Sequence, residues 1–387
     1  MTDHQPTAAE RAEDVAALTE MVREFAATRI APIVEELDET ERFPAEIYQE
    51  MGELGLLGIT VPEAMGGAGG LASDYAIVME ELSYGYASVA DQCGLVELVS
   101  SLLVAHGSQA QQQRYLPGLL AGTERCAYAL TEAGAGSDLG GVKTRAVRDG
   151  DDWVLNGEKI FIHNAPVADY AMVLAVTNPE LRKRGGMSMF LVDTDLPGVE
   201  RAYREHKMGQ RASQVGGFVF DNVRLPADAL LGEEGTGFGA VLSVLEKGRL
   251  GIGALANGIT RAALDTAREH AITRRQFGQP IGGFQSIAFT LADMATDYHA
   301  ARLLLNEAAA KLDAGADANV ACSMAKLFAS EAAIRTTGKA VQILGGSGFI
   351  RGVPAERLYR DARITTIYEG TSEVQRMIIS RSLVGRL

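Results

Sequence analysis

One carboxylate near the end of the chain has neighbours that suit acid–base chemistry. Glu369 lies in residues 367–373, between an aromatic run and an expected helix start. Ser372 and Gln375 have the S-x-x-Q spacing of a capping box, which predicts that the helix begins there. A carboxylate held before a helix can face an apolar cavity, where desolvation raises its pKa and makes it a base near neutral pH. The alternative is that Glu369 only offsets the helix dipole or pairs with an arginine.

A glycine-rich loop at residues 129–138 is the second candidate. Gly134 and Gly136 follow an apolar lead-in, and such spacing can turn backbone N–H groups toward one point, forming an anion nest for a diphosphate. Thr131 and Ser137 add hydroxyl groups. The loop matches neither the G-x-G-x-x-G dinucleotide motif nor the G-x-x-x-x-G-K-[ST] phosphate loop, so both assignments fail. An ordinary glycine turn before a strand is the alternative.

The elements that must position these segments follow from apolar periodicity. The first third of the chain is expected to be helical over residues 15–30, 45–56 and 74–120, with breaks at Gly107 and Pro117. The middle of the chain is expected to form strands. The pair at residues 156–157 is Asn-Gly, the strongest short hairpin signal, between two β-rich runs.

Strand-like runs separated by turn residues follow at 170–177, 187–193 and 217–223. Four long helical patterns then occupy about 238–273, 284–314, 317–344 and 371–385, which indicates an antiparallel bundle. The predicted fold is α+β and mainly α. We expect an N-terminal helical domain at residues 1–120, an antiparallel β-barrel domain at 121–231 and a C-terminal four-helix bundle domain at 232–387.

Bulk properties exclude several classes of function. The net charge is −14, from 36 basic and 50 acidic residues, which argues against nucleic acid as the main partner. Cys93, Cys126 and Cys322 are widely spaced, and the histidines have no metal-binding spacing, so we expect a reducing compartment and no metal site. No uninterrupted apolar run reaches the roughly 18 residues of a membrane span. Residues 1–6 lack signal-peptide features, and we expect a cytoplasmic protein.

Several segments resemble, in order, the motifs of the acyl-CoA dehydrogenase flavoprotein family. The loop at 129–138 matches the family's first signature, and residues 342–349 match most of the second. Residues 368–371 carry the family's commonest base position. Residues 207–211 and 274–278 also fall in family order, so the resemblance covers nearly the whole chain.

The resemblance implies FAD-dependent α,β-dehydrogenation of an acyl thioester to the 2-enoyl thioester. A base removes a proton from the α carbon, and a redox cofactor must accept the hydride because no side chain does. Glu369 would be the base and flavin N5 the hydride acceptor. The substrate carbonyl would accept hydrogen bonds from the Glu369 backbone N–H and a ribityl hydroxyl, which stabilise the enolate. Some relatives carry the base on an earlier helix, where this chain has Gly248.

The resemblance also assigns binding residues. Those expected around the flavin ring and its diphosphate are Tyr128, Leu130, Thr131, Gly136, Ser137, Phe161 and His163, with Thr371 and Glu373 after the base. Those expected to hold the adenine half from a different protomer are Arg274, Phe277, Gln342, Gly345 and Gly346. Those expected at the substrate are Ser137, Glu246, Arg249 and Gly370. A shared cofactor implies a homo-oligomer, and the family is typically tetrameric, with an electron-transfer flavoprotein as its usual electron acceptor.

Two positions depart from the family pattern. His163 stands where Thr or Ser is usual beside flavin N5, and Phe161 stands where Trp often covers the ring. A neutral His163 could hydrogen-bond the flavin, and a charged one would raise its potential. Alternatively, this histidine turns away and pairs with a carboxylate. Arg249 has two interpretations as well, direct substrate contact or an interdomain ion pair.

Residues 90–97 would form part of the acyl pocket. Asp91, Gln92 and Glu97 make this stretch more polar than in fatty-acyl members, which favours a short, branched or functionalised acyl group. A surface location for Asp91 and Glu97 is the simpler expectation. The carrier could be coenzyme A or an acyl carrier protein. The alternative functions are a flavin oxidase or monooxygenase on the same scaffold, and a non-catalytic binding protein that kept the fold.

Overall fold

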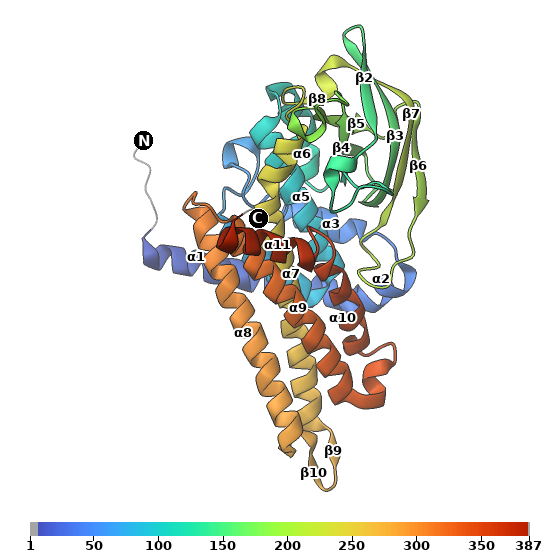
Figure 1. Cartoon of the computed structure of the whole chain (residues 1–387). Helices are drawn as coiled ribbons and strands as arrows, with labels where there is room; N and C mark the ends of the chain where they lie inside the picture. Colours follow the sequence, from blue (N-terminus) through green and yellow to red (C-terminus); the bar gives the residue numbers. More distant parts are fainter. Residues whose placement is uncertain (1–6, 386–387) are drawn as a thin grey trace.

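The computed structural model describes residues 7–385, and the segment 1–6, with the expectation attached to it, lies outside the described residues. Along the chain, a helical domain is followed by a β-sheet domain and a second helical domain (Figure 1). The predicted mainly helical α+β organisation is therefore confirmed.

From residue 7 onward, the first helical domain contains six α-helices. Their bounds are α1 (Ala8–Phe25), α2 (Val34–Thr40), α3 (Ala45–Glu53), α4 (Ala72–Gly85), α5 (Ala87–His106) and α6 (Gln109–Leu120). A π-helical turn, η1 (Ala26–Ile30), extends α1. The expected break at Gly107 is present, whereas the break expected at Pro117 is wrong because α6 continues through it, with Leu116, Leu119 and Leu120 buried.

Helix α5 lies at the centre of this domain. By length and composition this helix could cross a membrane, although the sequence has no uninterrupted apolar run of that length. However, 89% of its most apolar 18-residue window is buried inside the protein. It is therefore a core helix that packs against both α4 and α7 (Gly237–Thr273), and those two helices also pack against each other.

The middle domain contains one eight-stranded sheet in the order β6-β7-β3-β2-β4-β5-β8, with β1 pairing β4. The bounds are β1 (Cys126–Ala129), β2 (Arg145–Asp149), β3 (Asp152–His163), β4 (Tyr170–Val176), β5 (Met187–Asp193), β6 (Val199–Arg204), β7 (Val215–Leu225) and β8 (Leu230–Leu231). Neighbouring strands are antiparallel, except that β4 runs parallel to β1 and β2. Both faces of β4 are buried, one toward the helices and the other in the β domain.

The hairpin expected at residues 156–157 is wrong. Strand β3 is continuous through this point, and the turn that joins β2 to β3 lies at residues 150–151. The register of β3 against β7 shifts between Leu155 and Gly157. In this interval β7 has one residue more than β3, and that residue is absorbed as a bulge. A Cβ at Gly157 would lie 2.5 Å from Thr144 Oγ1. This glycine therefore permits a close approach of two strands, not a turn.

The second helical domain contains α7, α8 (Gln285–Asp313), α9 (Asn319–Leu344), α10 (Pro354–Ala362) and α11 (Ser372–Val384). The four long helical patterns correspond to α7, α8, α9 and α11. Sequence patterns did not predict α10 or the short hairpin of β9 (Arg275–Gln276) and β10 (Gln279–Pro280). A Cβ at Gly258 would lie 2.0 Å from Ser83 Oγ, so a glycine in α7 allows α4 to approach closely.

The buried Glu81 of α4 joins three helices by pairing with the half-exposed Arg23 and the largely buried Arg261. Its carboxylate accepts hydrogen bonds from Arg23 of α1 at 3.0 Å and from Arg261 of α7 at 2.6 and 2.8 Å, and the residue is 2% exposed. Glu81→Ala is expected to destabilise the protein by about 3–5 kcal/mol, because two arginines lose a buried partner. Urea denaturation measures the change. Asp149→Ala breaks an exposed pair with Arg224 and should cost less than about 1 kcal/mol; equal effects would contradict the prediction.

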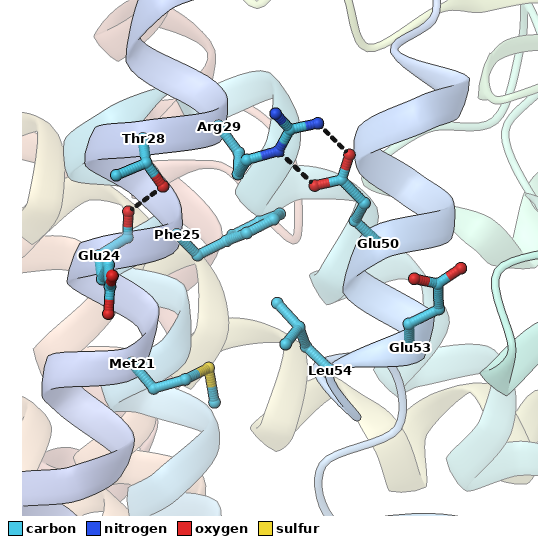
Figure 2. A pocket seen from close by; sticks show the side chains of 8 residues that line it. All are labelled: Met21, Glu24, Phe25, Thr28, Arg29, Glu50, Glu53 and Leu54. Atoms are coloured by element: carbon cyan, nitrogen blue, oxygen red, sulfur yellow. Dashed lines mark hydrogen bonds and ion pairs between the residues drawn. The ribbon is translucent and has the colours of Figure 1, made fainter.

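A surface groove of about 570 Å³ lies between α1 and α3 (Figure 2). Arg29 and Glu50 form an ion pair there at 2.5 Å, beside the apolar side chains of Met21, Phe25 and Leu54. None of the predicted site residues lines the groove. It is therefore not the candidate active site.

Candidate active site

Glu369 lies in the connection between η9 (Arg363–Thr366) and α11. Its φ is 51°, and Gly370 follows with φ 89°. A left-handed glutamate costs roughly 1–2 kcal/mol, a strain that persists where surrounding structure imposes it, often at functional sites. The Glu369 Oε2 atom is buried and has no hydrogen-bond partner among residues 7–385. An enclosed, unpaired carboxylate oxygen is free to accept a proton.

The start of α11 fixes this loop, but not by the expected capping box. The N-cap is Thr371, one residue earlier than predicted, because its backbone is extended and its hydroxyl accepts from Val374 N–H at 3.3 Å. The Gln375 amide instead donates to the carbonyl oxygens of Glu369 at 3.2 Å and Gly370 at 2.9 Å. The glutamine therefore holds the loop that carries the candidate base.

Two buried cations face the Glu369 carboxylate. Burial raises the pKa of Glu369, and Lys326 and Arg249 act in the opposite direction. Lys326 of α9 is fully buried and donates to the Gly370 carbonyl at 2.8 Å; burial lowers its own pKa to about 8. Arg249 donates to Asn319 at 2.6 Å and leaves its buried Nε unpaired. Across residues 7–385 Arg249 forms no ion pair, so the interdomain ion pair is not what the structure shows.

Lys326 supplies a test of these electrostatics. Lys326→Met removes a cation that favours the ionised form of Glu369, so the base is expected to ionise at higher pH. A base works only when ionised, so turnover near neutral pH should fall by about tenfold and recover as the pH rises. The pH profile of turnover measures this. Lys339→Met, which removes an exposed pair with Asp293, is the control, and an equal effect there would contradict the prediction.

Gly248 of α7 lies directly against the candidate base. A Cβ at this position would be 2.7 Å from Glu369 Oε2 and 3.3 Å from Leu98 Cδ2. The two positions at which family members carry the base therefore converge on one point in space. The glycine leaves room for the carboxylate that comes from residue 369.

The glycine-rich loop after β1 is held at its base and open at its tip. Glu132 and Ala135 exchange two backbone hydrogen bonds of 3.0 Å. The buried Lys159 of β3 donates to the Leu130 carbonyl and to the Glu132 carboxylate, both at 2.9 Å. A Cβ at Gly134 or Gly136 would meet no atom within 4 Å. Backbone that is fixed yet faces open space fits an anionic ligand such as a diphosphate.

Aromatic side chains near this loop suit a planar ring. A register shift in β3 between Lys159 and Ile162 turns Phe161 outward, with φ 55° and 63% exposure. The hydroxyl of Tyr128 in β1 is buried without a hydrogen-bond partner among residues 7–385. Burial raises the pKa of Tyr128, and Glu369 is the next cause, so the phenol lies near the base. An exposed aromatic face and an unpaired hydroxyl are features that a bound flavin would satisfy.

His163 lies beside a carboxylate, the second of its two expected arrangements. Its Nδ1 is 3.5 Å from Asp91 Oδ2, and its Nε2 is 2.8 Å from both Gln92 Nε2 and Ser213 Oγ. Burial lowers the pKa of His163, which favours the neutral ring. Ser213 also donates to Asp91 at 2.7 Å, which closes a polar network at this end of α5.

The expected surface location of Asp91 and Glu97 is wrong. Asp91 is 9% exposed and Glu97 is fully buried. Each has partners from distant segments: Ser213 for Asp91, and Lys247 for Glu97 at 3.1 Å. Both residues therefore lie inside the protein, where α5 faces the β domain and α7.

Two of the residues expected at the adenine half, Arg274 and Phe277, belong to the β9–β10 hairpin segment. The β9–β10 hairpin projects from the end of α7 opposite the β-sheet domain (Figure 1). Phe277 is 92% exposed at its tip, and Phe277 and Gly278 have φ of 50° and 82°, as in a type I′ turn. Gly345 and Gly346 face open space, since a Cβ there would meet no atom within 4 Å. The hairpin residues expected at the adenine half thus lie apart from the β-sheet domain of the same chain.

The remaining predicted positions are partly open to solvent. Arg274, Gln342, Ser137 and Glu373 are exposed, while Thr131, Thr371 and Glu246 are half-buried. Burial raises the pKa of Glu246. Sequence patterns missed Lys159, Glu132 and Lys326, although a lysine among the alanines of α9 was a visible signal. Among residues 7–385, no group of three His, Cys, Asp or Glu side chains could hold a metal ion.

Comparison with known proteins identifies the class. Three family models match along the chain: "Acyl-CoA dehydrogenase, N-terminal domain" over residues 12–123, "middle domain" over 127–223 and "C-terminal domain" over 235–384. An "Acyl-CoA dehydrogenase" of Bacillus subtilis is 42% identical over 95% of this chain and 97% of its own length. The chain belongs to the acyl-CoA dehydrogenase family.

Solved structures agree. Butyryl-CoA dehydrogenase from Megasphaera elsdenii superposes with a TM-score of 0.93 at 38% identity, covering 99% of this chain and 100% of that one. A glutaryl-CoA dehydrogenase from Mycobacterium smegmatis in complex with FADH2 gives 0.92 at 34% identity, covering 97% and 95%. The Acetobacterium woodii relative "Caffeyl-CoA reductase-Etf complex subunit CarC" is 41% identical over 95% of this chain and 97% of its own length. The protein is therefore an FAD-dependent oxidoreductase that acts on CH–CH groups of acyl thioesters.

Proposed function

We propose that Glu369 is the base that removes the α-proton of the acyl thioester. The observation that carries this proposal is the buried, unpaired Oε2 atom, which rests against Gly248. Burial raises the pKa of Glu369, which brings its proton affinity closer to that of a useful base at neutral pH. Lys326 and Arg249 keep the carboxylate ionised between turnovers.

The loop backbone completes the proton-transfer site. In the described turns and loops, the Glu369 N–H donates to no backbone carbonyl, so it is free to donate to the thioester oxygen. A hydrogen bond there stabilises the negative charge that develops when the α-proton leaves. FAD, when bound, supplies the acceptor for the hydride that departs from the β carbon. Gln375 and Lys326 hold the loop carbonyls, so the N–H and carboxylate keep their relative positions.

We also infer how the cofactor is held. The flavin half would contact Tyr128, Leu130, Thr131, Gly136, Ser137, Phe161, Thr371 and Glu373, whereas His163 turns toward Asp91. The adenine half would contact Arg274, Phe277, Gln342, Gly345 and Gly346 of another protomer. The separation of the hairpin from the β-sheet domain in one chain supports a shared site (Figure 1). Ser137, Glu246, Arg249 and Gly370 would contact the substrate.

We infer the protein partners from exposed apolar side chains and from one relative. Exposed apolar side chains of the C-terminal domain include Phe277, Phe289, Leu303, Phe349 and Ile350. Such side chains favour association of chains, and we infer a homotetramer. An electron-transfer flavoprotein is the proposed electron acceptor, and a relative named as a subunit of an Etf complex supports it. Cys93, Cys126 and Cys322 are free and buried, which is consistent with the cytoplasmic location that we propose.

Anaerobic titration of the purified protein with acyl thioesters tests the function. The proposal expects bound FAD whose absorbance bleaches with a coenzyme A or carrier-protein thioester, followed by slow reoxidation in air. Rapid reoxidation would favour the oxidase or monooxygenase alternative. A preparation that holds no flavin and cannot be reconstituted would contradict the enzymatic proposal.

A further inference from the structure

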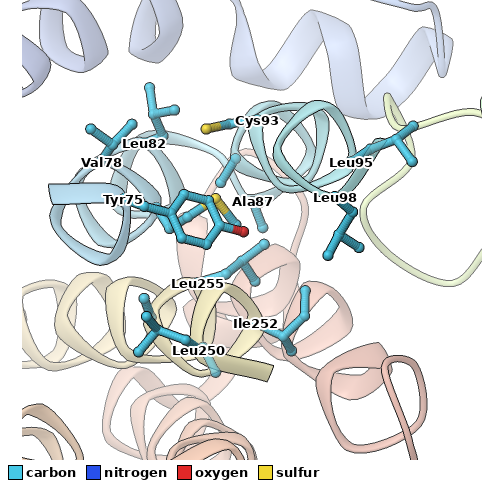
Figure 3. Packing of buried hydrophobic residues seen from close by; sticks show 14 of the residues in the cluster. Tyr75, Val78, Leu82, Ala87, Cys93, Leu95, Leu98, Leu250, Ile252 and Leu255 are labelled. Atoms are coloured by element: carbon cyan, nitrogen blue, oxygen red, sulfur yellow. The ribbon is translucent and has the colours of Figure 1, made fainter. Parts of the chain in front are cut away.

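Tyr75 of α4 occupies the space between α5 and α7. The residue is 1% exposed, and Figure 3 shows its ring among apolar side chains of all three helices, with the hydroxyl directed toward the side where Leu98 and Ile252 lie. A Cβ at Gly251 would lie 2.0 Å from the Tyr75 hydroxyl oxygen, and a Cβ at Gly94 would lie 3.5 Å from it. Two glycines, one on each facing helix, therefore make room for this hydroxyl.

The same two helices border the candidate base one turn further along. On α7, Gly248 precedes Gly251 by three residues, and its Cβ position lies 2.7 Å from Glu369 Oε2. On α5, Leu98 follows Gly94 by four residues and lies 3.3 Å from that Cβ position. Positions three or four apart on a helix lie on one face, about 5–6 Å from each other. The carboxylate and the phenol therefore face one strip of the α5–α7 interface from its two ends.

Electrostatics place the two groups together as well. The pKa of Tyr75 is raised first by burial, and then by Cys93, Glu97 and Glu369. A phenol affected by the Glu369 carboxylate lies within its neighbourhood. This effect on the pKa of Tyr75 agrees with the proximity that the positions of Gly248 and Gly251 indicate independently.

We propose that Tyr75 closes the acyl pocket and limits the enzyme to short straight-chain acyl thioesters of about four carbons. This inference rests on the proposed role of Glu369. The length of the pocket is taken from the spacing of Gly248 and Gly251, the α7 positions that face the carboxylate and the phenol, which is about 5–6 Å. Van der Waals contact takes up about 3.5 Å of that length, which leaves about 2 Å. An extended chain advances about 1.2 Å per bond, so two carbons fit beyond the α carbon.

A core tyrosine with no role in specificity is the competing explanation, and graded substitution separates the two. The series Tyr75→Phe, Tyr75→Leu and Tyr75→Ala removes increasing volume from the proposed end of the pocket. Tyr86→Leu is the matched control, because Tyr86 is equally buried and lies near Asp361 and Arg357 instead of the base. For each variant, kcat/KM is measured with butyryl-, hexanoyl-, octanoyl- and decanoyl-CoA.

The expected result is a hexanoyl-to-butyryl ratio that rises in the order Phe, Leu, Ala, by about fourfold for each methylene newly accommodated. Tyr86→Leu should keep the wild-type ratio. Binding of the same thioesters to the Glu369→Gln variant, alone and combined with Tyr75→Leu, gives the same order without turnover. It also keeps the test informative if Tyr75→Ala fails to fold.

The outcomes distinguish a failure of the proposed role of Tyr75 from a failure of the proposed dehydrogenase function. An unchanged ratio across the Tyr75 series, or a wild-type enzyme that prefers decanoyl-CoA, overturns the role of Tyr75 and leaves Glu369 as the base. A flavin that no thioester bleaches overturns the proposed function, and the inference with it.

Discussion

Glutamine at position 369 is expected to lower turnover of an acyl-CoA substrate by about 10²–10⁴-fold, the usual contribution of a general base. The amide keeps the size of the side chain but cannot accept the α-proton. Burial raises the pKa of Glu369, so the wild-type rate should increase with pH through that pKa as the carboxylate ionises. This increase should vanish in Glu369→Gln. Anaerobic stopped-flow bleaching of the flavin measures both effects.

The control for this variant is its flavin content, which should match that of the wild type. A Glu369→Gln enzyme that retains turnover within tenfold of wild type would show that another group takes the proton. Burial also raises the pKa of the half-buried Glu246, and Glu246→Gln should leave the pH dependence of turnover in place.

Moving the carboxylate to α7 is expected to restore part of the lost activity. Gly248→Glu alone should lower turnover by about a hundredfold, since its Cβ would lie 2.7 Å from Glu369 Oε2 and displace the native base. In the Glu369→Gly background the same substitution fills an empty position. The double variant should then exceed Glu369→Gly by at least about tenfold, because a base again reaches the α-proton. Single-turnover flavin reduction compares the three enzymes.

Gly239→Glu in the Glu369→Gly background is the matched control. Gly239 lies on the same helix, and a Cβ there would meet no atom within 4 Å. Equal recovery from this position would mean that a carboxylate anywhere on α7 restores the rate, and not one placed at Gly248 in particular.

Local patterns predicted the parts of the site that depend on neighbouring residues. The segment at 367–373 and the loop at 129–138 carry their turn chemistry in a few consecutive positions, so sequence placed Glu369 before a helix and the glycines in a loop. The long helices α7, α8 and α9 followed from their apolar period. In each of these cases the residues that determine the local structure lie close together in the sequence.

What sequence did not predict depends on contacts between distant segments. Asn156-Gly157 is a hairpin signal only if no other strand pairs with this segment. Strand β7, about sixty residues later in the chain, does pair with it. Charged residues such as Asp91 and Glu97 are usually exposed, and their burial depends on Ser213 and Lys247. Likewise, Lys326 becomes part of the candidate site only when α9 packs beside the Gly370 loop.

The position of the β9–β10 hairpin has a thermodynamic consequence. Because the hairpin projects from the end of α7 opposite the β-sheet domain, a cofactor shared as we propose would belong to the assembly and not to the monomer. In that arrangement cofactor retention and subunit association would be linked by mass action: dilution would release FAD, and added FAD would drive association. The yellow colour of a solution would report its state of assembly.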